Sequence, residues 1–150
     1  MQFEKQIAIA APREKVWQFI WDVDRFIACV PGCKEAKTLE KGKIYTATMV
    51  EKVGPFRVEF PMRIEIEQSE PLSHIKARAS GSDSKIGSLM KIELEVNLTE
   101  EGSGTLLSFV ATVNILGKMA TLGHSMIIRK ADQVMAEFVR EIKKNLEGEA

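Results

Sequence analysis

Between residues 34 and 116, apolar and polar residues alternate along most of the chain. The clearest run is 56–67, where every second residue is hydrophobic and most of the residues between them are charged. Similar runs cover 90–98 and 107–115. Such alternation is typical of antiparallel strands that bury one face and expose the other. Turn signals containing glycine or proline separate the runs, so the pattern predicts about six strands joined by short hairpins.

The first part of the chain predicts one strand followed by two short helices. Residues 2–10 are predicted as the strand. Pro12 suits the first turn of a helix, and the hydrophobic residues in 16–21 are too dense for a helix with one exposed face. A second short helical turn is predicted over 24–30, and Pro31 ends it.

The last segment predicts one long helix from about Lys118 to Leu146. Its apolar residues recur at spacings of three, four or seven, which places them on one stripe of a helix. At 1.5 Å per residue this helix is about 40 Å long, enough to cross a small sheet. The stripe consists of Met119, Leu122, Met126, Ile127, Val134, Phe138, Ile142 and Leu146.

Together these elements predict a single α+β domain over residues 1–150. The expected architecture is a helix grip, in which a curved antiparallel sheet of about seven strands wraps around the long C-terminal helix. The two short helices after the first strand close one end. A flat sheet with the helix laid on it is the alternative.

Methionines on the apolar faces indicate an adaptable interior. Five of the seven methionines fall on apolar or inward positions, and methionine suits irregular apolar sites. For any single methionine, filling a gap in an ordinary core is the stronger interpretation. We nevertheless predict an internal cavity that binds a hydrophobic small molecule. Its predicted lining is Phe56, Phe60, Met62, Met90, Phe109, Met119, Leu122 and Met126.

Charge and composition exclude several classes of function. Lys plus Arg (21) equals Asp plus Glu (21), and no basic run is present, so nucleic-acid binding is not expected. The N-terminus has no signal-peptide pattern, and no apolar stretch is long enough to span a bilayer. Two cysteines, Cys29 and Cys33, fit a reducing compartment and cannot complete a zinc site alone. We therefore expect a cytoplasmic protein without metal or other cofactor.

No group of residues in the sequence points to catalysis. His74 and His124 are the only histidines, and neither has a partner at the spacing of a triad or a ligand set. No phosphate-binding loop, dinucleotide-binding motif or nucleophile elbow is present. We expect no catalytic residue and a protein that is not an enzyme.

Four short segments carry a resemblance to a known family. They are Ala11–Trp17, Cys29–Cys33, Lys52–Pro55 and Gly117–Gly123, with the sequences APREKVW, CVPGC, KVGP and GKMATLG. In this order they resemble the carbon monoxide dehydrogenase G-subunit family of the START-like (SRPBCC) superfamily. The resemblance covers essentially the whole chain and independently implies the helix-grip fold.

The resemblance implies an accessory protein of a molybdenum hydroxylase, with the dehydrogenase subunits as its partners. It does not imply bound molybdenum, FAD or iron–sulfur clusters, since clusters alone need four or more cysteines. Trp21 stands where the family more often has a small or polar residue. The sequence ends at Ala150 without the long hydrophobic tail of some members, so anchoring by a tail is not carried over. Peripheral contact with the inner face of the membrane stays open.

Three functions remain after the sequence is considered. The first is non-catalytic binding of a lipid or an isoprenoid quinone in the internal cavity. The second is an assembly factor that docks on the dehydrogenase through its surface. The third is a cyclase- or hydrolase-like enzyme using the same cavity, which would need a polar cluster inside it.

Overall fold

The computed structural model describes residues 1–147 and confirms the predicted order of elements. One strand and two short helices are followed by six strands, a 3-10 turn and a long helix. The elements are β1 (Gln2–Ile9), α1 (Arg13–Trp21), α2 (Val23–Ala28), β2 (Cys33–Glu40), β3 (Ile44–Val53), β4 (Phe56–Glu70), β5 (His74–Asp83), β6 (Ser88–Glu101), β7 (Gly104–Gly117), η1 (Lys118–Leu122) and α3 (His124–Glu147).

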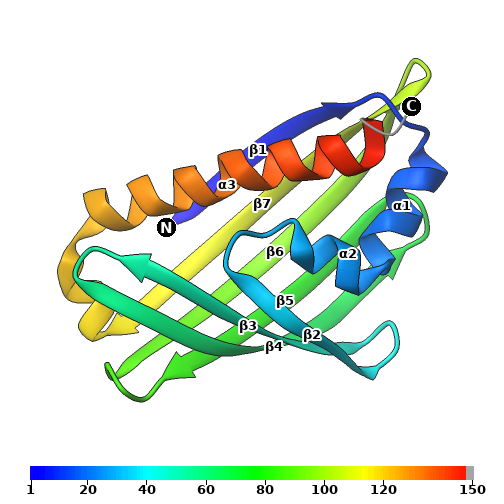
Figure 1. Ribbon diagram of the computed structural model, residues 1–150. Helices are drawn as coiled ribbons and strands as arrows, with labels where there is room; N and C mark the ends of the chain where they lie inside the picture. The colour runs from blue at the N-terminus through cyan, green and yellow to red at the C-terminus, as the bar shows by residue number, and fades with distance from the viewer. Residues whose placement is uncertain (148–150) are drawn as a thin grey trace.

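The seven strands form one antiparallel sheet in the order β1-β7-β6-β5-β4-β3-β2. Strands β2 to β7 are consecutive hairpins, and β1 pairs with β7 at the other edge. Figure 1 shows the sheet curving around α3, with α1 and α2 at one end. The α+β helix-grip prediction is confirmed, and the flat-sheet alternative is wrong.

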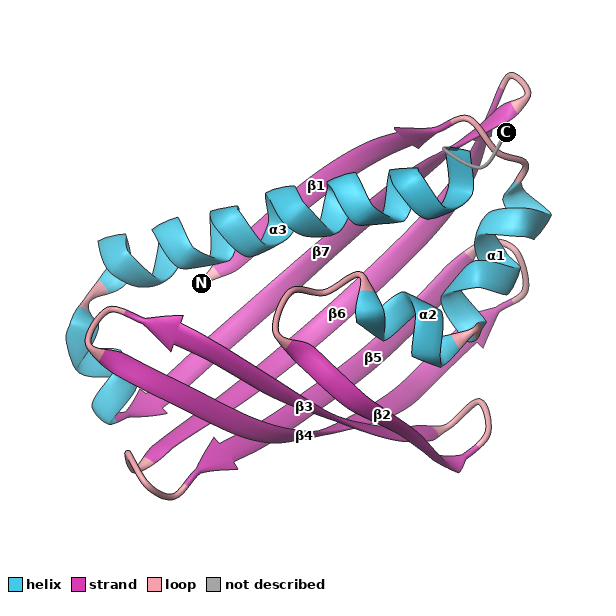
Figure 2. Ribbon diagram, viewed as in Figure 1, coloured by secondary structure: helices cyan, strands magenta, loops and turns pink. Residues whose placement is uncertain are grey.

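The curvature has a local origin in long and irregular strands. Strands β4, β6 and β7 contain 15, 14 and 14 residues, so strand twist accumulates along them. The pairing register shifts once in β4, between Ile66 and Gln68, and twice in β2. Such bulges bend a strand and increase its twist. In Figure 2, β2, β3 and β4 accordingly run in a different direction from β5, β6 and β7, which makes the sheet concave toward α3.

The predicted long helix begins later than its apolar pattern indicates. Gly117 has φ 87° and ψ −152°, and Gly123 has φ 85° and ψ 160°. Residues other than glycine are essentially excluded from this backbone region, so both glycines interrupt the helix. Residues 118–122 form the turn η1, and α3 starts at His124. Met126, in the first turn of α3, is 36% exposed although the predicted stripe includes it, whereas the adjacent Ile127 is buried.

Two separate groups of buried side chains attach the helices to the sheet. The α1-side cluster includes Val16, Phe19, Leu107, Ile142 and Leu146, and joins α1 and the end of α3 to the sheet. The η1-side cluster consists of Val53, Val58, Phe60, Met62, Met90 and Met119. A small domain usually has one contiguous core. Here the middle of α3 is only partly buried, as are the residues of β7 beneath it.

The helices of this protein were compared with the requirements for spanning a bilayer. Within residues 1–147, no helix is both long enough and apolar enough to cross a bilayer.

Asp83 is a buried carboxylate that ties β4 to the turn after β5. Its Oδ2 accepts a hydrogen bond from the backbone N–H of Glu59 (2.8 Å), and its Oδ1 accepts one from that of Lys85 (2.9 Å). The bond from Glu59 is the main cause that lowers the pKa of Asp83. Because the folded state favours the charged carboxylate, this contribution to stability is present above about pH 4 and is lost as the pH falls further.

We expect Asp83→Asn to lower the free energy of unfolding by about 1–2 kcal/mol at neutral pH, measured by chemical denaturation. The difference from the wild type should shrink as the pH falls below about 4, the ordinary pKa of an aspartate, because protonation then removes the charge that the folded state favours. The matched control is Asp132→Asn, because Asp132 is exposed on α3. A difference that stayed constant down to acid pH would contradict the assigned role of the charge.

Candidate functional site

An apolar cavity of about 200 Å³ lies between the sheet and the middle of α3. The sheet contributes Met90, Phe109 and Val113 to its wall, and α3 contributes Ala131 and Val134. The alternating pattern of β6 and β7 directs these strand residues inward, and the helical spacing directs Ala131 and Val134 toward them. The α1-side cluster packs the last turns of α3 against the sheet, and Met90 and Met119 of the η1-side cluster form part of the cavity wall.

A second apolar cavity of about 180 Å³ adjoins the first on the side of α2. Phe26, Leu94 and Phe138 are among the residues that line it. Phe109 and Met135 line both cavities and therefore form the wall between them. Each cavity alone is smaller than the roughly 300–1,000 Å³ of a typical small-molecule site, whereas the two together reach that range.

One ion pair stands at the first cavity. Lys130 Nζ on α3 lies 3.0 Å from Glu51 Oε2 on β3, and the two side chains are only 22% and 21% exposed. Glu51 Oε2 also accepts a hydrogen bond from the backbone N–H of Lys52 (3.2 Å). Among the described residues that line the two cavities, Glu51 and Lys130 are the only charged ones.

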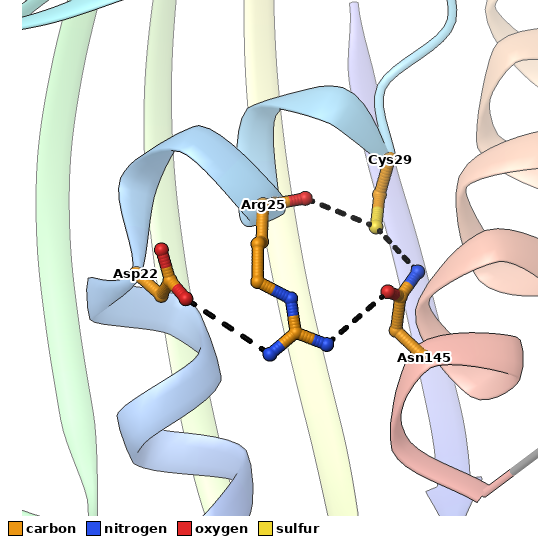
Figure 3. Close-up of polar contacts among 4 residues, drawn as sticks. All are labelled: Asp22, Arg25, Cys29 and Asn145. Atoms are coloured by element: carbon orange, nitrogen blue, oxygen red, sulfur yellow. Dashed lines mark hydrogen bonds and ion pairs between the residues drawn. The ribbon is translucent and has the colours of Figure 1, made fainter. Parts of the chain in front are cut away.

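Polar contacts join α2 to the last turns of α3. Figure 3 shows Arg25 between Asp22 and Asn145, with Cys29 beside them. The Arg25 guanidinium donates to Asn145 Oδ1 (3.4 Å), and it lies 3.9 Å from Asp22 Oδ2. Asn145 Nδ2 donates to Cys29 Sγ (3.5 Å), and the same thiol donates to the Arg25 carbonyl (3.5 Å). These contacts join the end of α3 to α2, so this end of the interior is held by both helices.

Neither cysteine has the properties of a reactive thiol. Burial is the main cause that raises the pKa of Cys29, and the charge of Glu141 adds to it. Burial and the charge of Glu51 raise the pKa of Cys33 to about 11. Both side chains are therefore almost entirely thiols at neutral pH, and thiolate is the nucleophilic form. No cluster of metal-ligating side chains occurs within residues 1–147.

The structure brings part of the predicted lining together. Met90, Phe109 and Met119 line the first cavity. Phe60 and Met62 are instead buried in the η1-side cluster, and Phe56 and Leu122 pack against that cluster partly buried. Met126 is 36% exposed and lines neither cavity, and its sulfur lies beside Gly54 in the turn between β3 and β4. Whether any of the eight residues binds a ligand remains a prediction.

Several lining residues were not predicted from the sequence. They include Ala111, Ala131, Val134, Met135 and Lys130. A detectable signal was the presence of alanine at inward positions of both a strand and a helix, since a small side chain there leaves space. Lys130 gave no such signal, because a lysine within a helix is ordinarily exposed.

A larger hollow of about 480 Å³ lies where α1 and α2 meet the β2–β3 turn. Its wall contains Trp17, Trp21, Asp22 and Lys41, so the hollow is partly polar. It shares no lining residue with either of the two apolar cavities. Trp21 therefore belongs to this outer hollow, where its ring makes an edge-on contact with Trp17 at 5.8 Å.

Solved structures with the same architecture define the class of this protein. A conserved protein from Geobacillus kaustophilus superposes with a TM-score of 0.87 at 21% identity, over 97% of this chain and 95% of that chain. A START superfamily protein from Mycobacterium smegmatis superposes with a TM-score of 0.76 at 12% identity, over 99% of both chains. A protein from Thermus thermophilus gives 0.70 at 14% identity, over 97% of both. At these identities the likeness shows the fold, which is that of a START-like domain.

The amino-acid sequence assigns this protein to a family. The model of the carbon monoxide dehydrogenase G-subunit (CoxG) family matches residues 6–147, and the chain belongs to this family. The resemblance seen in the four short segments is thereby confirmed. Among curated proteins, no sequence matches this chain.

Proposed function

We propose that this protein binds a long-chain lipid or an isoprenoid quinone in its interior, as a non-catalytic accessory protein of a molybdenum hydroxylase of the carbon monoxide dehydrogenase type. The observation that carries the proposal is the pair of adjoining apolar cavities between the sheet and α3. Membership in the CoxG family supports the choice of enzyme system.

The apolar lining of the two cavities supports a bound apolar ligand. Their exposed wall is entirely apolar, so water inside them has few hydrogen-bond partners. An apolar molecule that fills the space recovers dispersion contacts and removes its own surface from water. A long flexible chain suits this site better than a compact molecule, because the two cavities lie end to end along α3.

Native mass spectrometry with organic extraction tests the proposal. We expect the purified full chain to carry a lipid-like mass, or to take up an added decyl-substituted benzoquinone in a one-to-one complex. The thermal unfolding temperature should rise with ligand concentration, because a ligand that binds only the folded state stabilises it. Absence of any copurified lipid together with no uptake of added quinone or fatty alcohol would exclude a carrier.

Docking on the dehydrogenase through the surface is the second candidate. Large apolar side chains are exposed near the η1 end of the molecule: Leu116 (54%), Ile128 (38%) and Met126 (36%). A pull-down with the dehydrogenase subunits separates the candidates. Binding that survives when the cavity is filled by a bulky substitution but disappears with Leu116→Ser and Ile128→Ser supports docking in place of carriage.

The enzymatic alternative is not proposed, since it requires a cluster of polar groups in the interior. Of the described lining residues of the two cavities, only Glu51 and Lys130 carry charge, and they pair with each other.

A further inference from the structure

Three chain segments meet at the end of the molecule that carries η1. They are residues 52–57 around the β3–β4 turn, residues 84–88 around the β5–β6 turn, and residues 116–129 from the end of β7 into α3. The sulfur of Met126 lies beside Gly54, and the backbone N–H of Lys118 donates to the Gly87 carbonyl (3.2 Å). Figure 1 shows these turns together, opposite the end that holds α1 and α2. We call the three segments the basic end.

The charged residues of the basic end all have one sign. Five of the 21 Lys and Arg residues of the chain lie in these segments, and none of its 21 Asp and Glu residues does. The five are exposed, and they are Lys52, Arg57, Lys85, Lys118 and Arg129. Within residues 1–147, no ion pair includes any of them. Since the whole chain is formally neutral, the positive charge gathered here is balanced by negative charge elsewhere on the molecule.

The nearest acidic groups along the chain do not neutralise the basic end. Glu51 is paired with Lys130, and Asp83 is buried with both carboxylate oxygens accepting backbone hydrogen bonds. Glu59 and Asp132 are exposed just outside the three segments. Even when Asp83, Glu59 and Asp132 are all counted against the five basic residues, this end keeps a positive excess.

Large apolar side chains are exposed among these charges. Of the four large hydrophobic side chains that are exposed within residues 1–147, three belong to the basic end: Leu116 (54%), Ile128 (38%) and Met126 (36%). Met126 and Ile128 flank the buried Ile127, so they lie on the two sides of the first turns of α3. Exposed apolar side chains that gather at one place on a soluble protein mark an interaction surface.

An anionic lipid surface fits this combination of side chains. Basic side chains are attracted to negatively charged headgroups, and apolar side chains enter the boundary between headgroups and acyl chains. Lys and Arg also have long apolar stems, which can be buried in that boundary while the charge stays at the headgroups. A second copy of this chain does not fit, because two basic ends would repel each other.

We propose that the basic end docks this protein on an anionic phospholipid membrane, with its three exposed apolar side chains in the interface and its five Lys and Arg side chains at the headgroups. This inference goes beyond the proposed function, because it concerns an outer surface that exists whether or not the cavities hold a ligand. Val53, Met119 and Ile127 of the basic end also line the first cavity, so docking places that cavity next to the membrane.

Sedimentation of the full-length protein with vesicles tests the proposal. Two vesicle compositions are compared: phosphatidylcholine alone, and phosphatidylcholine with about 30% phosphatidylglycerol. We expect the wild type to bind the anionic vesicles at least about tenfold more tightly than the neutral ones. This difference should shrink at about 1 M salt, because salt screens charges at the surface.

Removing two basic side chains should weaken binding to the anionic vesicles. Lys118→Gln combined with Arg129→Gln should lower the affinity about 25-fold, since each basic residue near an anionic surface contributes about fivefold. The matched control is Lys41→Gln combined with Lys144→Gln, which removes two exposed charges at the opposite end of the molecule. This control should keep the wild-type affinity within about twofold. Thermal unfolding shows whether each variant is folded.

The apolar contribution is tested with Leu116→Ser combined with Ile128→Ser. This variant should lose at least about tenfold in affinity for the anionic vesicles, because less apolar surface enters the interface. Its dependence on salt should stay like that of the wild type, since all five basic residues remain. Leu39→Ser is the matched control, because Leu39 is 57% exposed but lies on β2 outside the basic end.

The outcomes separate docking from the proposed function. Equal binding of the wild type to both vesicle compositions, or unchanged binding after the loss of Lys118 and Arg129, would overturn the docking proposal. No binding to either vesicle would also overturn it, and loss of a dehydrogenase pull-down in the Leu116 and Ile128 variant would then make the basic end a protein-docking surface. Uptake of a decyl-substituted benzoquinone is measured separately, without vesicles. If the quinone is taken up but no vesicle is bound, the proposed function stands and the docking proposal is wrong; the reverse result supports docking alone.

Discussion

Ala131→Phe is expected to abolish the uptake of a long-chain ligand while the protein remains folded. Ala131 lies on α3 between Ile127 and Val134, and its methyl group is part of the wall of the first cavity. A phenyl ring at this position projects into the empty space that a ligand chain would occupy. Because the ring fills a void, the change in the free energy of unfolding should stay below about 2 kcal/mol, at the low end of the overpacking range.

Ala136→Phe is the matched control, since Ala136 lies further along the same helix and is exposed. It should bind ligand like the wild type. Titration with a decyl-substituted benzoquinone, followed by native mass spectrometry, measures both variants. Uptake by Ala131→Phe equal to that of the control would mean that the ligand lies elsewhere, for example in the outer hollow beside Trp21.

Gly117→Ala is expected to have the largest effect on stability, lowering the free energy of unfolding by about 3 kcal/mol or more. The backbone of Gly117 lies in a region that essentially only glycine adopts. A methyl group there would also collide with the carbonyl oxygen of Gly87, a backbone atom that cannot move aside cheaply. The turn into η1 would therefore separate from the β5–β6 turn.

Gly123→Ala separates the backbone strain from the collision with the Gly87 carbonyl oxygen. Gly123 has a similar backbone conformation, but a methyl group on it would meet nothing within 4 Å. It should cost only the conformational strain, about 1–3 kcal/mol. Chemical denaturation of both variants gives the difference. If Gly117→Ala and Gly123→Ala lose the same free energy of unfolding, the collision with Gly87 contributes nothing to the loss.

Gly117→Ala also has a consequence for the cavity. Met119, two residues after Gly117, lines the first cavity, and its backbone N–H donates to Ser88 Oγ (2.8 Å). Displacing the turn would loosen this attachment and open the cavity at the η1 end. We therefore expect Gly117→Ala to release bound ligand faster than Gly123→Ala, measured by probe displacement over time.

The strands and the class of fold were predictable because their signal is local. Alternation with period two in runs such as 56–67 places hydrophobic residues on one face of a strand wherever that strand lies in the molecule. Turn residues between the runs limit the connections to hairpins, and hairpins order the strands. The family was predictable for a related reason, since short segments such as Gly117–Gly123 carry it directly in their residues.

The composition of the cavity wall was predictable only in part. Met90, Phe109 and Met119 lie where the pattern placed them, on inward faces beside the cavity. Phe60 and Met62 share the same inward pattern but are enclosed by neighbours in the η1-side cluster. A periodic pattern identifies the face of an element and does not give the distance to the element opposite, which decides between a filled core and an open space.

By itself the sequence determined the order of elements, the inward face of each strand, and membership in the CoxG family. Only the tertiary structure decided that α3 begins at His124, that the α1-side cluster holds its last turns, and that Glu51 meets Lys130 beside the first cavity. The physical reason is that secondary structure follows from interactions between residues close in the chain. A cavity and an ion pair depend on how far two distant elements approach each other, and here the bends of the strands and the glycines before α3 set that approach.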